Sequence, residues 1–143
     1  MGSIFLPHLV TGWHVDQAIL HGDDKIVVIR FGNDASMECM QVDEALYGIA
    51  EQVKNFASIY VCDTTEVPDF NEMYELWDPV TLMFFYGNQH MLCDFGTGEN
   101  NKLTLVVTDP QKLIDVIETI YRGAMKGKRF VVSPVDFSKD KKS

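Results

Sequence analysis

Two hydrophobic patterns alternate along the first half of the chain. A continuous β-branched run at 25–31 predicts a strand covered on both faces, and 57–63 predicts a second strand. Between them, apolar residues recur every three or four positions from Met40 to Phe56, which predicts one long amphipathic helix. A strand, a crossover helix and a strand in this order predict a parallel, right-handed βαβ unit.

The second half predicts a hairpin followed by a helix. Strands are expected at 81–86 and 89–95, because the dipeptide Gly87-Asn88 between them is typical of a two-residue hairpin loop. Asp109-Pro110 then begins a last amphipathic helix, and we expect that helix to end before Gly123.

Two shorter helices complete the prediction, one at 13–20 with Thr11 as its cap and one at 68–76 with Pro68 at its entry. The resulting order is βαβ, a linking helix and ββα. This order predicts an α/β protein of thioredoxin-like fold, with a central mixed β-sheet flanked by helices.

Length and composition favour one soluble domain over residues 1–143. The chain is 46% hydrophobic, and none of its apolar runs approaches the roughly 18 residues of a membrane span. The start of the chain lacks the basic flank and long apolar run of a secretory signal. We therefore expect no membrane contact, and three widely spaced cysteines suit a reducing compartment.

Charge divides the chain into an acidic body and a basic end. The net charge of −9 combines −14 over residues 1–121 with +5 over residues 122–143. An acidic body disfavours general binding of nucleic acid, whereas the basic end is able to contact RNA or an acidic protein. We expect 123–143 to be a partly irregular segment, and 123–137 to order fully only against a partner.

The loop between the first strand and the long helix bears on chemistry. Thioredoxin-type redox enzymes present two cysteines here, separated by two residues, and this chain has Ser36 and Cys39 at those positions. Dithiol exchange needs both sulfurs, so the second thiol is missing. Glu38 disfavours a thiolate at its neighbour, and Arg30 stands where redox thioredoxins keep a buried carboxylate.

We therefore interpret Ser36, Cys39 and Pro79 as vestigial redox-loop positions, with no catalytic residue among them. Cys39 is expected to be small and half-buried, although a monothiol reaction with glutathione is an open alternative. Pro79 matches a loop proline that is cis in thioredoxin-like folds. Beside it, Trp77 and Met37 border a groove suited to an extended peptide.

Other chemistries find no support in the sequence. The four histidines have no ligand spacing with one another or with the cysteines, so no metal site is predicted. The Gly-rich loop at 96–101 lacks the Gly-Lys-Ser/Thr of a phosphate-binding loop. We expect neither a cofactor nor a small-molecule substrate.

Four stretches of the chain resemble one family closely, and they lie at 15–19, 27–32, 65–71 and 120–124. They look like the Dim family of small thioredoxin-like spliceosomal proteins, and the resemblance runs from about Leu6 to Phe137. It implies a nuclear, non-enzymatic subunit of the U5 snRNP and spliceosomal tri-snRNP. Such a subunit acts in pre-mRNA splicing and is linked to cell-cycle progression.

The resemblance also implies partners, namely the large central scaffold protein of the spliceosome and the proteins that bridge the snRNPs. One loop departs from the family, because its aromatic-Asp-Pro-Thr-Cys run is replaced here by residues 35–39. Val80 also stands where the family often has a cysteine, which excludes a disulfide between that position and Cys39.

The basic end supplies most of the predicted partner-binding residues. Positive side chains follow the last helix, and an apolar run comes directly after them. Charge near a helix C-terminus also complements its dipole, which is the purely structural alternative. The candidates for partner binding are Arg122, Lys126, Lys128, Arg129, Phe130 and Trp77.

Overall fold

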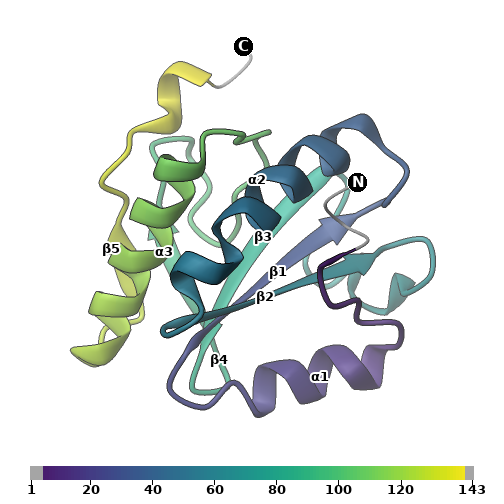
Figure 1. Cartoon of the computed structure of the whole chain (residues 1–143), viewed down its shortest axis with the longest axis horizontal. Coiled ribbons are helices and arrows are strands. Elements are labelled where there is room, and N and C mark those ends of the chain that lie inside the picture. The colour runs from purple at the N-terminus through teal and green to yellow at the C-terminus, as the bar shows by residue number, and fades with distance from the viewer. Residues whose placement is uncertain (1–4, 141–143) are drawn as a thin grey trace.

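The computed structural model describes residues 5–140, which form one five-stranded sheet with helices on both faces (Figure 1). The strands are β1 (Ile26–Gly32), β2 (Ala57–Asp63), β3 (Val80–Tyr86), β4 (Gln89–Asp94) and β5 (Phe130–Val132). The helices are α1 (Gly12–Leu20), α2 (Met37–Val53) and α3 (Pro110–Met125), with short 3-10 turns η2 (Pro68–Phe70) and η3 (Phe137–Asp140).

The sheet is mixed, with the strand order β2-β1-β3-β4-β5. β1 pairs with β2 in parallel and with β3 in antiparallel orientation, so the predicted βαβ unit and the predicted mixed sheet are confirmed. β3 and β4 form the predicted hairpin around Gly87 and Asn88. The predicted α/β architecture, a mixed sheet flanked by helices, is therefore confirmed, and β5 is the strand that was not predicted.

β1 is covered on both faces, as the sequence predicts. Ile26 and Val28 face the core beneath α2 and α3, whereas Val27 and Ile29 face a second core with Val15 of α1. Successive side chains of a strand point to opposite sides, so one apolar run supplies both cores. In Figure 1, α1 lies below the sheet while α2 and α3 lie on its other side.

The two edges of the sheet differ. A segment preceding α1 runs along β2, where the Leu9 amide donates to the Val61 carbonyl at 2.9 Å and the Val61 amide donates to Pro7 at 3.0 Å. His8 forms an isolated parallel bridge with Val61. At the other edge, β5 pairs with β4 in parallel, and no strand among residues 5–140 lies beyond it.

The helix predicted at 68–76 is wrong, because only the 3-10 turn η2 forms there. Glu75 has a φ of +53°, outside the right-handed helical region, so the chain turns at this point. The Leu76 amide donates a hydrogen bond across this turn to the carbonyl of Asn71 at 2.9 Å. The buried Lys102 side chain holds the turn further by donating to the carbonyls of Tyr74 and Glu75.

The end of α3 also differs from the prediction, since this helix continues through Gly123 to Met125. Gly123 is buried, and a Cβ at this position would overlap Cγ1 of Val131 in β5. The glycine is therefore a contact point between helix and strand, and the actual turn that ends the helix contains Gly127 with a φ of +81°.

The prediction that 123–137 orders only against a partner is wrong. Val131 is buried, and Phe137 has no exposed surface and contacts the ring of Phe95 with centroids 6.2 Å apart. The Phe137 amide donates to the Phe95 carbonyl at 2.9 Å. The segment thus completes the core of the molecule, although 141–143 lie outside the described residues.

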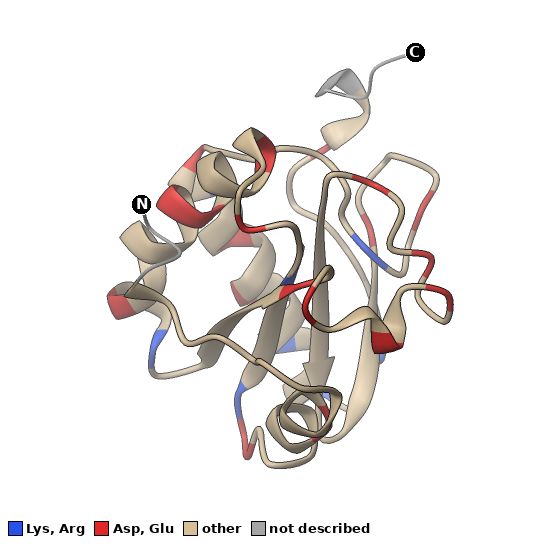
Figure 2. Cartoon of the chain, turned by 90° about the vertical axis from the view of Figure 1, so that its right-hand side faces the viewer, with Lys and Arg blue, Asp and Glu red and all other residues tan. Residues whose placement is uncertain are grey.

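Acidic residues are spread over the helices and loops in Figure 2, with few basic ones between them. Within the described part of the chain, none of the helices has the length and apolarity that crossing a bilayer requires.

Candidate functional site

The redox-loop position Ser36 caps α2. Its Oγ accepts a hydrogen bond from the Cys39 amide at 3.1 Å, so the serine satisfies a free donor at the helix start. The helix begins at Met37, three residues before Met40, where the apolar repeat that predicts it starts. Ser36 therefore has a local structural role at the position where a redox enzyme needs its attacking thiol.

Cys39 is completely buried, in contrast to the half-buried residue expected from the sequence. Its Sγ donates to the carbonyl of Pro79 at 3.3 Å. Burial raises the pKa of the Cys39 thiol, and the nearby Arg30 guanidinium only partly opposes this effect. The thiol is consequently both inaccessible and protonated at neutral pH, which is the opposite of an activated nucleophile.

Gly32 at the end of β1 allows this close approach. Its φ is +149°, and a Cβ there would overlap Sγ of Cys39 and lie 2.7 Å from the Pro79 carbonyl oxygen. Sequence reasoning missed Gly32 as part of the site. The available signal was a glycine directly after a run of β-branched residues, since such a glycine often marks close approach of another backbone.

Pro79 lies beside this thiol, but the described residues contain no cis peptide bond, so the expected cis geometry is wrong. The intrinsic preference between cis and trans is only about 0.5–1 kcal/mol before proline, so the surroundings decide it. Here the Pro79 carbonyl accepts from Cys39, and the following Val80 pairs with Gly32 in the sheet. Trp77 is highly exposed next to this loop.

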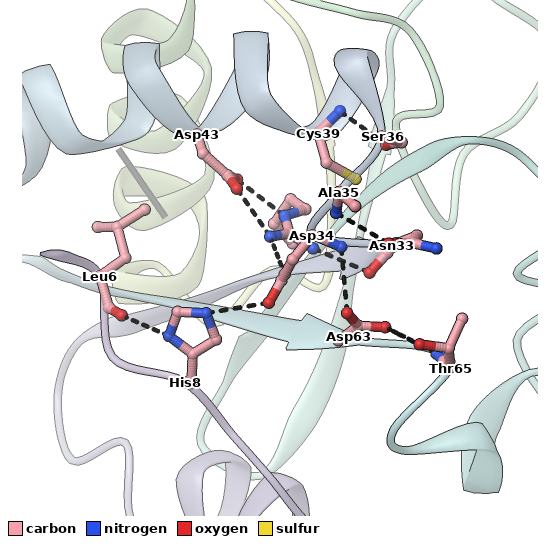
Figure 3. Close-up of polar contacts among 12 residues, drawn as sticks. Leu6, His8, Asn33, Asp34, Ala35, Ser36, Cys39, Asp43, Asp63 and Thr65 are labelled. Atoms are coloured by element: carbon pink, nitrogen blue, oxygen red, sulfur yellow. Dashed lines mark hydrogen bonds and ion pairs between the residues drawn. The ribbon is translucent and has the colours of Figure 1, made fainter. Parts of the chain in front are cut away.

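Behind the loop, Arg30 forms a fully buried ion pair with Asp43 of α2 (Figure 3). Nε donates to Oδ1 at 2.8 Å and Nη2 donates to Oδ2 at 2.7 Å, while Nη1 donates to the Gly32 carbonyl at 3.0 Å. Burial opposes the charge on Arg30, but the hydrogen bonds and charge of Asp43 more than compensate and raise the Arg30 pKa.

Asp34 extends this network toward the start of the chain. Its Oδ1 accepts from Nη2 of Arg30 at 2.6 Å, and its Oδ2 lies 3.1 Å from Nε2 of His8. The His8 Nδ1 in turn lies 3.0 Å from the Leu6 carbonyl. In Figure 3 these side chains link the segment along β2 to the loop that precedes α2.

Asp63 at the end of β2 holds the other side of the loop. Its Oδ2 accepts from the Asp34 amide at 3.2 Å, and its Oδ1 accepts from the amide and hydroxyl of Thr65 at 2.8 and 2.6 Å. Burial acts to raise the Asp63 pKa, but these hydrogen bonds outweigh it and lower the pKa. Asp63 therefore remains ionised as a structural acceptor.

The network contains a buried carboxylate, but Asp43 is not equivalent to the proton acceptor of a redox enzyme. Both of its oxygens accept hydrogen bonds from the Arg30 guanidinium, so this carboxylate is held in an ion pair, and Arg30 separates its role from that of an unpaired proton acceptor. Sequence reasoning identified Arg30 as anomalous but missed Asp43, Asp34 and His8. A cation inside an apolar strand was the signal that a buried carboxylate must accompany it.

A second group of candidate residues gathers where α3 meets β5. A hollow of about 400 Å³ lies there, and it brings together four of the six predicted partner-binding residues. Its lining consists of Thr119, Arg122, Gly123, Lys126, Lys128, Phe130, Val131 and Val132. Arg129 does not line it and instead donates to the His90 carbonyl at 3.3 Å, and Trp77 does not line it either.

Comparison with known proteins decides the family. The sequence model of the family described as "Mitosis protein DIM1" matches residues 5–137. The chain belongs to the DIM1 family. It is 65% identical over 138 residues to "Spliceosomal protein DIB1" of Eremothecium gossypii, which covers 96% of each chain.

Two further DIM1-family relatives are similarly close. The Saccharomyces cerevisiae protein, also named "Spliceosomal protein DIB1", is 60% identical over 96% of each chain. The Schizosaccharomyces pombe protein "Mitosis protein dim1" is 60% identical over 95% of this chain and 96% of its own length. The resemblance identified from the sequence is confirmed.

Solved structures confirm the thioredoxin-like fold of this DIM1-family chain. Chloroplastic thioredoxin z matches with a TM-score of 0.66 at 16% identity, covering 82% of this chain and 96% of that one. Fasciola hepatica thioredoxin matches with a TM-score of 0.62 at 14% identity, covering 82% and 98%. At such identities the likeness concerns the fold alone.

Proposed function

We propose that this chain is a non-catalytic subunit of the spliceosome that acts in pre-mRNA splicing through contacts with other proteins. The observation that carries the proposal is its 65% identity, over nearly the full length of both chains, to a protein named as spliceosomal. A second relative with the same name is 60% identical over the same share. A nuclear location follows from this function.

The geometry of the redox loop supports a role without catalysis. Ser36 stands in place of the attacking thiol and caps a helix, and the Cys39 thiol is buried and hydrogen-bonded to Pro79. The carboxylate of Asp43 is engaged by Arg30. A thiol–disulfide cycle needs an accessible thiolate and a resolving thiol, and this loop offers neither.

The family resemblance makes the proposal more specific. On its basis we further propose that the chain is a subunit of the U5 snRNP and the spliceosomal tri-snRNP, with the large central scaffold protein and the snRNP-bridging proteins as its partners. A role in binding other proteins is also consistent with the thioredoxin-like fold, because the core of this protein is intact while its redox loop lacks the groups needed for thiol–disulfide exchange.

Replacement of the Saccharomyces cerevisiae relative tests this function. In cells depleted of that relative, expression of this chain is expected to restore the ratio of spliced to unspliced transcripts, measured by reverse transcription and quantitative PCR. The Cys39→Ala variant is expected to restore it equally. Failure of the folded wild-type chain to restore splicing contradicts the splicing role, and failure of Cys39→Ala alone contradicts the non-catalytic role.

Reduction of insulin disulfides by the purified protein tests the absence of redox turnover independently. We expect no turnover above the rate with reductant alone, because Cys39 has no accessible thiolate. A thioredoxin serves as the positive control. Turnover that disappears in Cys39→Ala would establish the monothiol alternative instead.

A further inference from the structure

The sheet ends in one covered edge and one open edge. Residues 7–9 run beside β2 and exchange backbone hydrogen bonds with Val61. No strand among residues 5–140 lies on the far side of β5. Unpaired edges are templates for another extended chain, and proteins normally cover them or interrupt them.

The pairing of β5 shows which of its backbone groups are free. The Leu92 amide donates to the Arg129 carbonyl at 2.7 Å, and the Ser133 amide donates to the Asp94 carbonyl at 2.9 Å. In a parallel ladder, alternate residues of one strand bond to the same neighbour. The N–H and C=O groups of Phe130 and Val132 consequently point away from β4, toward the open edge.

The side chains of these two residues are also exposed. Phe130 is 46% exposed and Val132 is 65% exposed, whereas Val131 between them is buried against α3. The edge therefore offers two backbone donors, two backbone acceptors and two partly exposed apolar side chains, with no strand of the described chain beside them. This combination is what an added strand uses, since backbone bonds give affinity and side-chain contacts give selectivity.

Charge indicates the nature of the occupant. Arg122, Lys126 and Lys128 line the hollow between α3 and β5, and no acidic side chain lines it. One neighbouring carboxylate, Glu118, pairs with Arg122 at 3.0 Å, which leaves a positive excess. The rest of the molecule is acidic, so this basic surface is the region that favours an anionic partner.

We propose that β5 accepts an extended acidic segment of a partner protein as an additional strand, with its carboxylates against Arg122, Lys126 and Lys128. The proposal rests on the proposed function, because it assigns a surface and a binding mode to the protein contacts inferred there. A peptide fits better than RNA, because a peptide backbone supplies the alternating donors and acceptors that Phe130 and Val132 require.

Site-specific photocrosslinking in assembled complexes tests the proposal. The Phe130→p-benzoylphenylalanine change places a photoreactive ring on the edge with little change in shape, and the tagged full-length chain carries it into splicing complexes. After irradiation, the crosslinked peptides are sequenced by mass spectrometry. We expect a crosslink to one protein segment of net negative charge, and the same label at exposed Lys54 is expected not to reach that segment.

The crosslinked segment is then synthesised and its affinity for the full-length chain is measured by isothermal titration calorimetry. Val132→Pro removes the outward N–H while keeping every N–H that bonds β5 to β4, and it is expected to weaken binding about threefold to tenfold. Val132→Thr, which keeps this donor, is its control. Lys126→Glu with Lys128→Glu is expected to weaken binding at least about tenfold, whereas Lys54→Glu is not.

Each other outcome overturns the proposal. A crosslink to RNA, or to a neutral or basic segment, contradicts the acidic strand. Equal affinities of Val132→Pro and Val132→Thr contradict strand addition, provided that circular dichroism shows both variants folded. Absence of any crosslink while the tagged chain still co-purifies with splicing proteins refutes this surface but leaves the splicing function in place, whereas loss of co-purification by the unmodified chain refutes the function itself.

Discussion

Arg30 and Asp43 form a two-bond ion pair inside the molecule, with both side chains completely buried. The pair joins the interior strand β1 to α2, directly behind the loop where a thioredoxin performs its chemistry. Asp34 and the Gly32 carbonyl accept the remaining hydrogen bonds described for the guanidinium. The region behind the redox loop is thus used to fix α2 on the sheet.

Removal of one partner of this pair is expected to destabilise the fold strongly. Asp43→Ala leaves the buried Arg30 charge with Asp34 as its remaining anion, and loss of a buried partner typically costs about 3–5 kcal/mol. The free energy of unfolding in urea measures this. Glu51→Ala breaks only the exposed Glu51–Lys54 pair and is the control, with an expected change within about 0.5 kcal/mol.

An apolar replacement of the whole pair separates charge from packing. Arg30→Met combined with Asp43→Leu leaves no unpaired buried charge, so it is expected to be more stable than Asp43→Ala alone. An equal or greater loss of stability in the double variant would contradict this account of the pair.

The cysteines are expected to resist alkylation in the folded protein. Cys39, Cys62 and Cys93 are all buried, and burial raises the pKa of Cys62 and of Cys93 to about 12. At about pH 8 such a thiol has only about one thiolate in 10⁴ molecules. Mass spectrometry after iodoacetamide treatment should show no adduct in buffer and three adducts in urea. Rapid modification of Cys39 in buffer would contradict the structure.

The contact of Gly123 with Val131 predicts a change of sign between two genetic backgrounds. Gly123→Ala in the wild type inserts a methyl group against Cγ1 of Val131 and is expected to destabilise, since overpacking costs about 1–3 kcal/mol. The Val131→Ala background lacks the Cγ1 methyl group that causes this overlap. There, Gly123→Ala should stabilise α3 by up to about 1 kcal/mol. Thermal and urea unfolding of the four proteins gives both values.

His90 is expected to make stability fall as the pH decreases from neutral. Burial lowers its pKa from the usual 6.5, and the adjacent Arg129 acts in the same direction, against the hydrogen bond to Asn101. As the pH falls through 6.5, His90 therefore binds more protons in the unfolded chain than in the folded chain. The free energy of unfolding decreases until the pH has passed the lower pKa of His90 in the folded protein.

Urea unfolding between about pH 7.5 and about pH 5 measures this dependence, and His90→Gln should flatten it. Asp63 does not interfere, because its lowered pKa removes stability only below its usual value of 3.8. If the free energy of unfolding of His90→Gln fell with decreasing pH as steeply as that of the wild type, another group would be the cause of the lost stability.

The fold was largely predictable because β1 is a long apolar run rich in β-branched residues, a Gly-Asn turn separates β3 from β4, and the long helices have clear apolar periods. β5 was not, since three residues with Phe130 and Val132 exposed carry no strand pattern; its pairing depends on β4 and on α3. Likewise, the turn at Glu75 depends on the distant Lys102, so local propensity for a helix at 68–76 was overruled by tertiary contacts.

In the redox loop, too, some features could be predicted from the sequence and others depend on tertiary contacts. The missing thiol at Ser36 and the oddity of Arg30 are visible in the sequence, because both are departures at single positions. Which carboxylates accompany Arg30 is not visible, since Asp43 and Asp34 come together with it only after α2 crosses the sheet. The depth of Cys39 similarly depends on the distant Pro79.

The coverage of β2 by residues 7–9 has a consequence for stoichiometry. A sheet with two open edges can join copy to copy without limit, whereas within residues 5–140 this sheet leaves only the β5 edge unpaired. If two copies of the chain joined through that edge, each would use its one open edge, and the assembly would close as a pair.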